Sequence, residues 1–291
     1  MSNATNAPVD GAALNDPGEF VVAIDTGSRA RRIAFRVLAV ITTLWMLALS
    51  VFGLLELVLM WLPGETLMSM IDDFTATDLS HRSHFMSVGI VAWATVLAIV
   101  VQLRKPARRV APMLQLVVIA IAAAVVFALS GTFGDWLLAE ATILVPVLLL
   151  TWLHPRARDL VSKPTFDRAM FALTAVAAVP WSVFIVNHAR LQLASAAGDS
   201  HAELEHWANA ALMAIVILAC GFIGSSDHDG WRLPAWIAAG ASLVYGVHSL
   251  VFPDPSSAAS TVWAVAAVAW GLVFGVSIVR RSRAGQHAVT P

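Results

Sequence analysis

Charged residues are scarce in this chain, and their scarcity decides its class. They make up 13% of the 291 residues, while hydrophobic residues make up 58%; about a quarter of an ordinary soluble domain is charged. A soluble globule of usual design is therefore excluded, and lipid must be the main solvent. The formal net charge of -1 carries little information, because in a membrane protein the distribution of charge among the loops matters more than the total.

Cysteine is nearly absent too. The one thiol, Cys220, lies inside an apolar run, which excludes an intramolecular disulfide and any thiolate cluster for zinc or iron–sulfur chemistry. We expect Cys220 to be buried and inert. The chain also has no basic domain and no basic stripe interleaved with aromatic residues, so nucleic acid is excluded as a partner.

Short catalytic motifs are missing as well. The sequence contains no Walker motif, no GxSxG elbow, no HExxH pair and no DxxxD-type prenyl-phosphate motif. It therefore indicates no particular enzyme class, and whether the protein is an enzyme stays open.

Long apolar runs are what the chain has in quantity. A helix that crosses the hydrocarbon core needs about 20 mainly apolar residues, since each residue rises about 1.5 Å across about 30 Å. Eight runs meet this length, at residues 33–61, 85–103, 110–130, 136–153, 169–189, 204–223, 233–251 and 260–279. The sequence therefore predicts an all-α fold, a polytopic membrane bundle of eight transmembrane helices.

The predicted membrane domain covers residues 29–283. Residues 1–28 are small and polar and lack the basic start and short apolar core of a secretory signal peptide. We expect this segment to be a disordered tail, because it has too little apolar surface to offset the entropy of ordering. Residues 284–291 are expected to form a second, short tail.

The positions of Lys and Arg predict the orientation of the helices, because these residues are retained on the cytoplasmic side. If both termini are cytoplasmic, all but two of the 18 basic residues, Arg82 and Arg190, fall in cytoplasmic segments. Missing one span would move the later basic loops to the wrong side. We therefore expect a plasma-membrane protein with both termini in the cytoplasm.

A weak internal repeat relates the two halves, 29–155 and 164–283. An offset of about 122 residues aligns His84 with His206 and Pro112 with Pro234, and an offset of about 132 aligns Glu56 with His188. The matches are few, so either chance or a 4+4 duplication accounts for them. A duplication predicts two similar four-helix units related by an axis normal to the membrane.

The histidines gather on one side of this topology. Of nine, only three fall at the cytoplasmic side, whereas the others lie at or near the extracytoplasmic helix ends: His81, His84, His188, His201, His206 and His248. Ionisable groups inside a span are costly and usually face a cavity or one another. Glu56, in the first helix, approaches the same level from the other direction.

Imidazoles with a carboxylate are the ligands that first-row metals favour. The sequence therefore predicts a metal site built from His188, His206, His248 and Glu56. Histidines on facing helices also serve as axial ligands of haem, and for either cofactor the predicted binding residues are His84, His188, His206 and His248. The competing interpretation is that these side chains are ordinary interfacial residues, with Glu56 paired to Arg190 or protonated.

In layout the chain is similar to haem A synthase, which shares its length, its helix count and a 4+4 organisation with histidine ligands. That resemblance implies histidines on the even-numbered helices of each half. Here the fourth helix offers only His154, at its far end, the eighth offers none, and the family's ExxxH pattern is missing. Membrane hydrolases related to alkaline ceramidases and adiponectin receptors use a zinc site and typically show an HxxxH pair on a late helix, where this chain has His248 alone. The sequence is assigned to neither family.

Three functions follow as alternatives. The first is a membrane protein with an outward-facing histidine pocket that binds a transition metal or haem for redox chemistry. The second is a small-solute or proton-coupled transporter that uses the same polar layer. The third is a non-catalytic membrane subunit or scaffold with no site of its own, embedded in the lipid bilayer and with protein partners that the sequence does not indicate.

Overall fold

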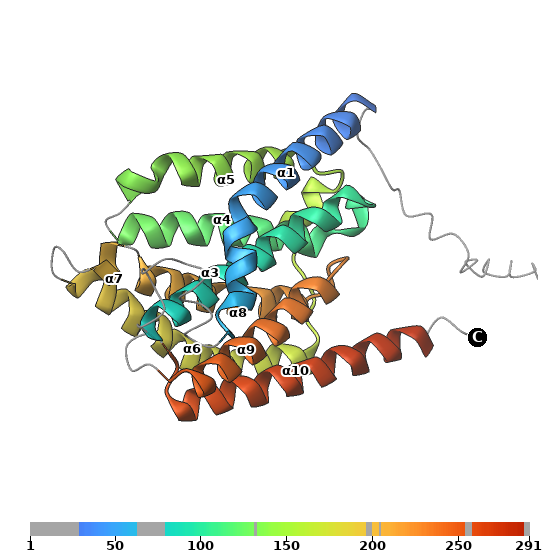
Figure 1. The fold of residues 1–291 in the computed structure, drawn as a ribbon. Helices are drawn as coiled ribbons and strands as arrows, with labels where there is room; N and C mark the ends of the chain where they lie inside the picture. The colour runs from blue at the N-terminus through green and yellow to red at the C-terminus, as the bar shows by residue number, and fades with distance from the viewer. Residues whose placement is uncertain are drawn as a thin grey trace, which may run out of the picture.

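The computed structural model describes residues 29–62, 79–130, 133–195, 200–203, 205–253 and 258–287. The structure is 86% helical and has no strands among these residues, only an isolated bridge between Phe166 and Ser226. The predicted tail 1–28 and residues 288–291 of the predicted tail 284–291 lie outside the described residues, and the last helix continues to His287. The all-α prediction is confirmed (Figure 1).

Within the described residues, eight helices are at least 20 residues long, and each overlaps one predicted run. They are α1 (Arg29–Leu59), α3 (Leu79–Val100), α4 (Val110–Leu129), α5 (Phe133–Leu153), α6 (Arg168–Ala194), α8 (His206–Ser225), α9 (Arg232–Val251) and α10 (Thr261–His287). The shorter helices are α7 (Ser200–Glu203), η1 (Val101–Leu103), η2 (Pro106–Arg108) and η3 (Ala157–Val161). By length and composition, all the long helices except α5 could cross a membrane, seven in all; in α5 the apolar part is Ala141–Leu153.

The long helices pack in two groups of four. In the first group, α1 packs against α3 and α5, and α4 also packs against α3 and α5. In the second, α6 packs against α8 and α10, and α9 packs against the same two helices. The groups meet where α3 and α4 contact α8 and α9, at the centre of the bundle (Figure 1).

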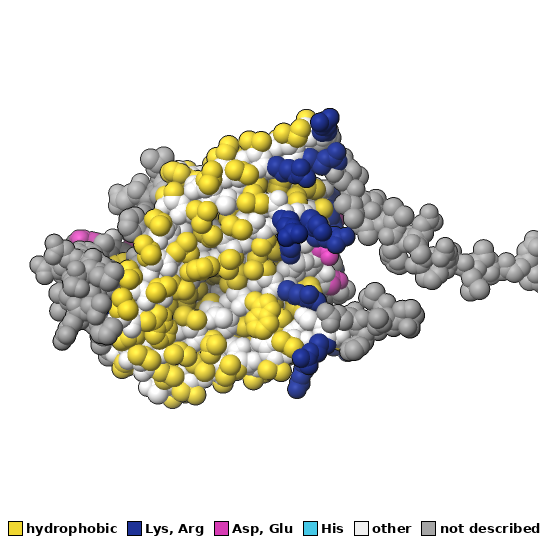
Figure 2. Space-filling model, turned by 45° about the vertical axis from the view of Figure 1, so that its right-hand side comes forward, with side chains coloured by type: hydrophobic (Ala, Val, Ile, Leu, Met, Phe, Trp, Pro, Cys, Tyr) yellow, Lys and Arg dark blue, Asp and Glu magenta, His cyan; other side chains and the backbone are white. Residues whose placement is uncertain are grey.

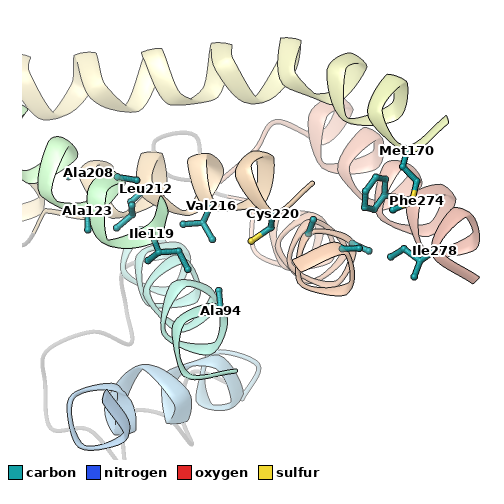
Figure 3. Packing of buried hydrophobic residues seen from close by; sticks show 14 of the residues in the cluster. Ala94, Ile119, Ala123, Met170, Ala208, Leu212, Val216, Cys220, Phe274 and Ile278 are labelled. Carbon is teal, nitrogen blue, oxygen red and sulfur yellow. The ribbon is translucent and has the colours of Figure 1, made fainter. Parts of the chain in front are cut away.

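Apolar side chains from both groups fill this central contact. Ala94, Ile119 and Ala123 from the first group lie in one cluster with Val216 and Cys220 from α8 (Figure 3). Cys220 is buried, as the sequence predicts. Burial of these side chains fixes how the two groups of helices face each other.

Close backbone approach holds the helices together, as is usual where lipid supplies no hydrophobic driving force between them. A Cβ atom at Gly224 would lie 2.6 Å from the Ala235 Cα, so α8 and α9 touch there. Polar side chains add bonds between helices: Gln115 Nε2 donates to the Ala94 carbonyl at 2.7 Å, and Trp270 Nε1 donates to the Leu173 carbonyl at 2.8 Å.

The outer surface of the bundle is apolar. Large side chains such as Trp152, Val176 and Val262 are each more than two-thirds exposed. Figure 2 shows this apolar surface ending in a rim of Lys and Arg side chains. Exposed apolar patches of such extent mark contact with lipid or protein, and with the apolar helices they indicate a multi-pass membrane protein.

Candidate functional site

Four histidines lie at the end of the bundle opposite the basic rim. His84 is in the first turns of α3 and His206 begins α8, while His188 and His248 come near the ends of α6 and α9. Because consecutive helices run antiparallel, these positions share one level, which we call the histidine end. All four side chains are at least 93% buried.

His84 and His206 are in direct contact. Their ring centroids are 4.0 Å apart and their planes are inclined by 26°, so the imidazoles stack. One ring comes from each group of four helices, at the interface of α3 with α8. The alignment that pairs these histidines in the sequence thus pairs residues that touch in space.

The turn before α8 holds His206 in place. Gln192, near the end of α6, accepts a hydrogen bond from the Ala208 N–H at 3.2 Å and donates to the Ala202 carbonyl at 2.9 Å. Glu205 precedes the helix in a left-handed conformation, with φ of 58°, and its side chain is buried. A non-glycine residue in this conformation is uncommon and is maintained only by surrounding contacts.

His248 lies in a separate aromatic enclosure. Its ring meets Trp61 edge to face at a centroid distance of 5.5 Å and lies 5.0 Å from the Phe252 ring. The guanidinium of Arg82 stands 4.8 Å above the same Phe252 ring, and it donates to the carbonyls of Met60 and Leu62 at 3.4 and 3.0 Å. Arg82 is only 4% exposed, so it is buried at the histidine end together with the four histidines.

His188 packs against its own helix. Its Nδ1–H donates to the Phe184 carbonyl at 2.9 Å, four residues earlier, and its ring lies on the Phe184 ring at 3.8 Å. Phe184 in turn contacts Tyr245 of α9 at 5.7 Å. His188 is thus held by the backbone of its own helix and by the ring of Phe184.

The described residues contain no group of three or more His, Cys, Asp or Glu side chains placed to hold one metal ion. The side chain of Glu56 lies outside the described residues, as do those of His81 and His201. Of the predicted site residues, the structure brings together His84 and His206. The set of His188, His206, His248 and Glu56 stays a prediction.

The stacked pair favours some ligands over others. Metal–nitrogen bonds of about 2 Å lie in the imidazole plane, so the two stacked rings would have to tilt toward a common point to bind one ion as neighbouring ligands. The two axial ligands of a haem lie on opposite faces of the macrocycle, and rings in mutual contact cannot occupy those positions. In this arrangement His84 and His206 do not sandwich a haem.

Two further buried residues of the histidine end, Arg82 and Glu205, could not be predicted from the sequence as part of the site. The charge distribution identifies Arg82 only as a basic residue outside the cytoplasmic segments, and Glu205 is not among the predicted site residues. Their place beside His84 and His206 in the chain was the available indication. Hydropathy cannot show it, because a polar residue at a helix end lies either in water or in a protein contact.

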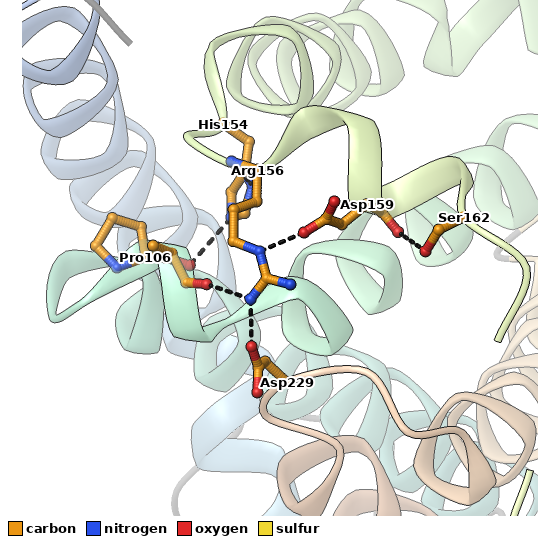
Figure 4. Close-up of polar contacts among 7 residues, drawn as sticks. Pro106, His154, Arg156, Asp159, Ser162 and Asp229 are labelled. Carbon is orange, nitrogen blue, oxygen red and sulfur yellow. Dashed lines mark hydrogen bonds and ion pairs between the residues drawn. The ribbon is translucent and has the colours of Figure 1, made fainter. Parts of the chain in front are cut away.

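The opposite end holds a polar network around Arg156 (Figure 4). Its guanidinium forms ion pairs with Asp159 and Asp229 and donates to the Ala107 carbonyl at 3.2 Å. Asp227 accepts hydrogen bonds from the Thr165 hydroxyl and N–H, and these hold the pKa of Asp227 below its ordinary value. These bonds hold the turn between α8 and α9 against the loop before α6. Arg156 also joins that loop to the one before α4.

Comparison with known proteins adds no relative. No family model, no curated protein and no solved structure matches this chain. The residues themselves are therefore the basis for a function.

Proposed function

We propose that this is an eight-span plasma-membrane protein that binds a transition-metal ion at a histidine site on its extracytoplasmic face. The eighth span in this proposal is α5, whose 21 residues lie between two helices that are apolar enough to cross. The rim of Lys and Arg supports a cytoplasmic basic end, and the histidine end then faces outward.

We also propose that the two groups of four helices are duplicates. The match of α4 with α9 supports this. Both helices are 20 residues long, and α9 begins and ends 122 residues after α4 begins and ends. So does the contact between His84 and His206, because equivalent residues meet only near a twofold axis. At the other end, Pro112 lies beside Gly230. Gly230 is four residues before Pro234, the residue that the 122-residue offset aligns with Pro112. An axis through both points would be normal to the membrane.

The stacked imidazoles of His84 and His206 are the observation that carries the metal site. Their contact joins two imidazoles from different groups of helices, and a tilt of the rings would let one nitrogen of each bind the same ion. Zinc, copper, nickel and cobalt all accept imidazole nitrogen. His188 and His248, with Glu56, are the further ligands proposed to complete the site when the ion is bound.

Metal binding to the purified protein tests the proposal. With Co²⁺ as the probe, whose visible absorption changes when nitrogen ligands bind, we expect about one ion per chain. The variants His84→Ala and His206→Ala should each weaken binding at least tenfold, since loss of even a supporting residue costs about 10–100-fold. The haem spectrum of protein expressed with haem available is recorded in parallel.

A matched control is His228→Ala, which removes a histidine from the turn at the basic end. It should bind Co²⁺ like the unaltered protein. Equal affinities in all three variants would contradict the metal site, and so would failure of the unaltered protein to bind Co²⁺, Zn²⁺ or Cu²⁺. Protection of Cys220 from thiol reagents confirms that each variant is folded.

The orientation has its own test, since the chain has one cysteine. In a Cys220→Ala background, exposed serines at the two ends provide a matched pair, Ser162 at the basic end and Ser260 at the histidine end. A membrane-impermeant maleimide should label Ser260→Cys in intact cells, whereas Ser162→Cys should react only after the membrane is opened. The reverse pattern would invert the topology.

One observation favours a second function, proton-coupled transport. The stacked pair lies where the two groups of helices meet, and transporters built from repeats bind their substrates at that interface. A proton flux in liposomes, abolished by His206→Ala, combined with no metal binding by the unaltered protein would replace the first proposal with this one.

A further inference from the structure

A groove runs along the outer surface between α9 and α10. Its volume is about 480 Å³, within the range of about 300–1,000 Å³ for sites that hold small molecules. Gly240, Gly271 and Gly275 line it without side chains, and Trp236 forms part of its wall. A Cβ atom at Gly240 would meet nothing within 4 Å, so the space above that residue is open.

The groove has the length of one lipid leaflet. Along α10, the lining extends from Gly271 to Arg283, and at about 1.5 Å per residue these 12 steps cover about 18 Å. Half of the hydrocarbon core is about 15 Å thick. A chain in the groove would therefore begin near mid-membrane and end at the level of the headgroups.

Two arginines close the groove at its basic end. Arg280 and Arg283 are exposed and line it. Their neighbour Arg281 instead points inward, where it donates to the carbonyls of Gly224 and Ser226 and stacks on Trp231 at 3.8 Å. The groove is thus apolar over most of its length and positive where it reaches the membrane surface.

We propose that this groove binds an anionic phospholipid. One acyl chain lies over Gly240, Gly271 and Gly275 against Trp236, and the phosphate is held by Arg280 and Arg283. Arginine suits a phosphate because its guanidinium donates two parallel hydrogen bonds, and basic sites between helices at the cytoplasmic surface commonly take anionic headgroups. The site is separate from the histidine end, so it stands or fails independently of the metal proposal.

Native mass spectrometry of the detergent-purified protein tests this site, with phosphatidylglycerol and phosphatidylcholine of equal chain length as probes. We expect phosphatidylglycerol to be retained preferentially. The double variant Arg280→Gln/Arg283→Gln should lower that preference at least fivefold. A Cβ atom at Gly240 meets open space, so Gly240→Leu places its side chain in the groove and should reduce retention of both lipids.

Two controls match these changes. Arg104→Gln/Arg158→Gln removes the same charge from exposed positions outside the groove, and Ala175→Leu adds the same side chain to an exposed position of α6. Both should bind lipid like the unaltered protein. The proposal is overturned if the two charge variants behave alike, if inorganic phosphate displaces the lipid completely, or if Gly240→Leu instead removes a dimer, because the groove would then hold a second copy.

Discussion

Replacing Gly224 by alanine is expected to destabilise the bundle by about 2–4 kcal/mol, although only one methyl group is added. The new Cβ would lie 2.6–2.7 Å from the Cα, Cβ and N atoms of Ala235. Two of these are backbone atoms that no rotamer change can move, so α8 and α9 must separate. Overpacking of this kind costs about 1–3 kcal/mol, and separation would also strain the hydrogen bond from Arg281 to the Gly224 carbonyl, worth about 1.5–3 kcal/mol for a charged donor.

Gly240→Ala is the matched control. Both glycines are in helices, where alanine is favoured by about 1 kcal/mol, but the Cβ at Gly240 meets open space. Thermal unfolding can be followed by a dye that reacts with the buried thiol of Cys220 on exposure. We expect Gly240→Ala to melt at or above the temperature of the unaltered protein and Gly224→Ala well below it. Similar melting temperatures for the two variants would show that α8 and α9 do not touch as described.

The helices could be predicted from the sequence because lipid imposes a simple rule on them. The run at 110–130 corresponds to α4 (Val110–Leu129), and the run at 233–251 to α9 (Arg232–Val251). The predicted run at 85–103 begins too late, because α3 begins at Leu79. Its first turns contain Arg82 and His84, which hydropathy assigns to a loop but which contacts with other helices bury.

For the candidate site, the sequence could predict only at which end of the bundle the histidines lie, and not which of them are in contact. Charge distribution placed His84, His188, His206 and His248 at one end, and all four lie there. Which of them meet depends on the rotation of each helix, which a sequence of mainly apolar helices does not specify. The 122-residue offset paired His84 with His206, but a repeat of a few residues was insufficient to predict their contact.

At the opposite end, His154 should make stability depend on pH. The residue is fully buried; its Nε2 lies 3.2 Å from the Pro106 carbonyl, and its Nδ1 accepts from the Arg156 N–H at 3.2 Å. These partners select the neutral form with the proton on Nε2, because a second proton on Nδ1 would face another donor. Burial lowers the pKa of His154 to about 4 from 6.5.

The sign of the effect follows from proton binding. Between pH 6.5 and 4 the unfolded chain takes up a proton at His154 that the folded chain does not, so stability is full above pH 6.5 and falls as the pH is lowered toward 4. A shift of this size corresponds to about 3 kcal/mol. In His154→Gln, whose amide donates to the Pro106 carbonyl but does not titrate, the fall in melting temperature over this range should be smaller. If both proteins lose stability equally, other groups titrate there and the His154 proton does not govern this end of the bundle.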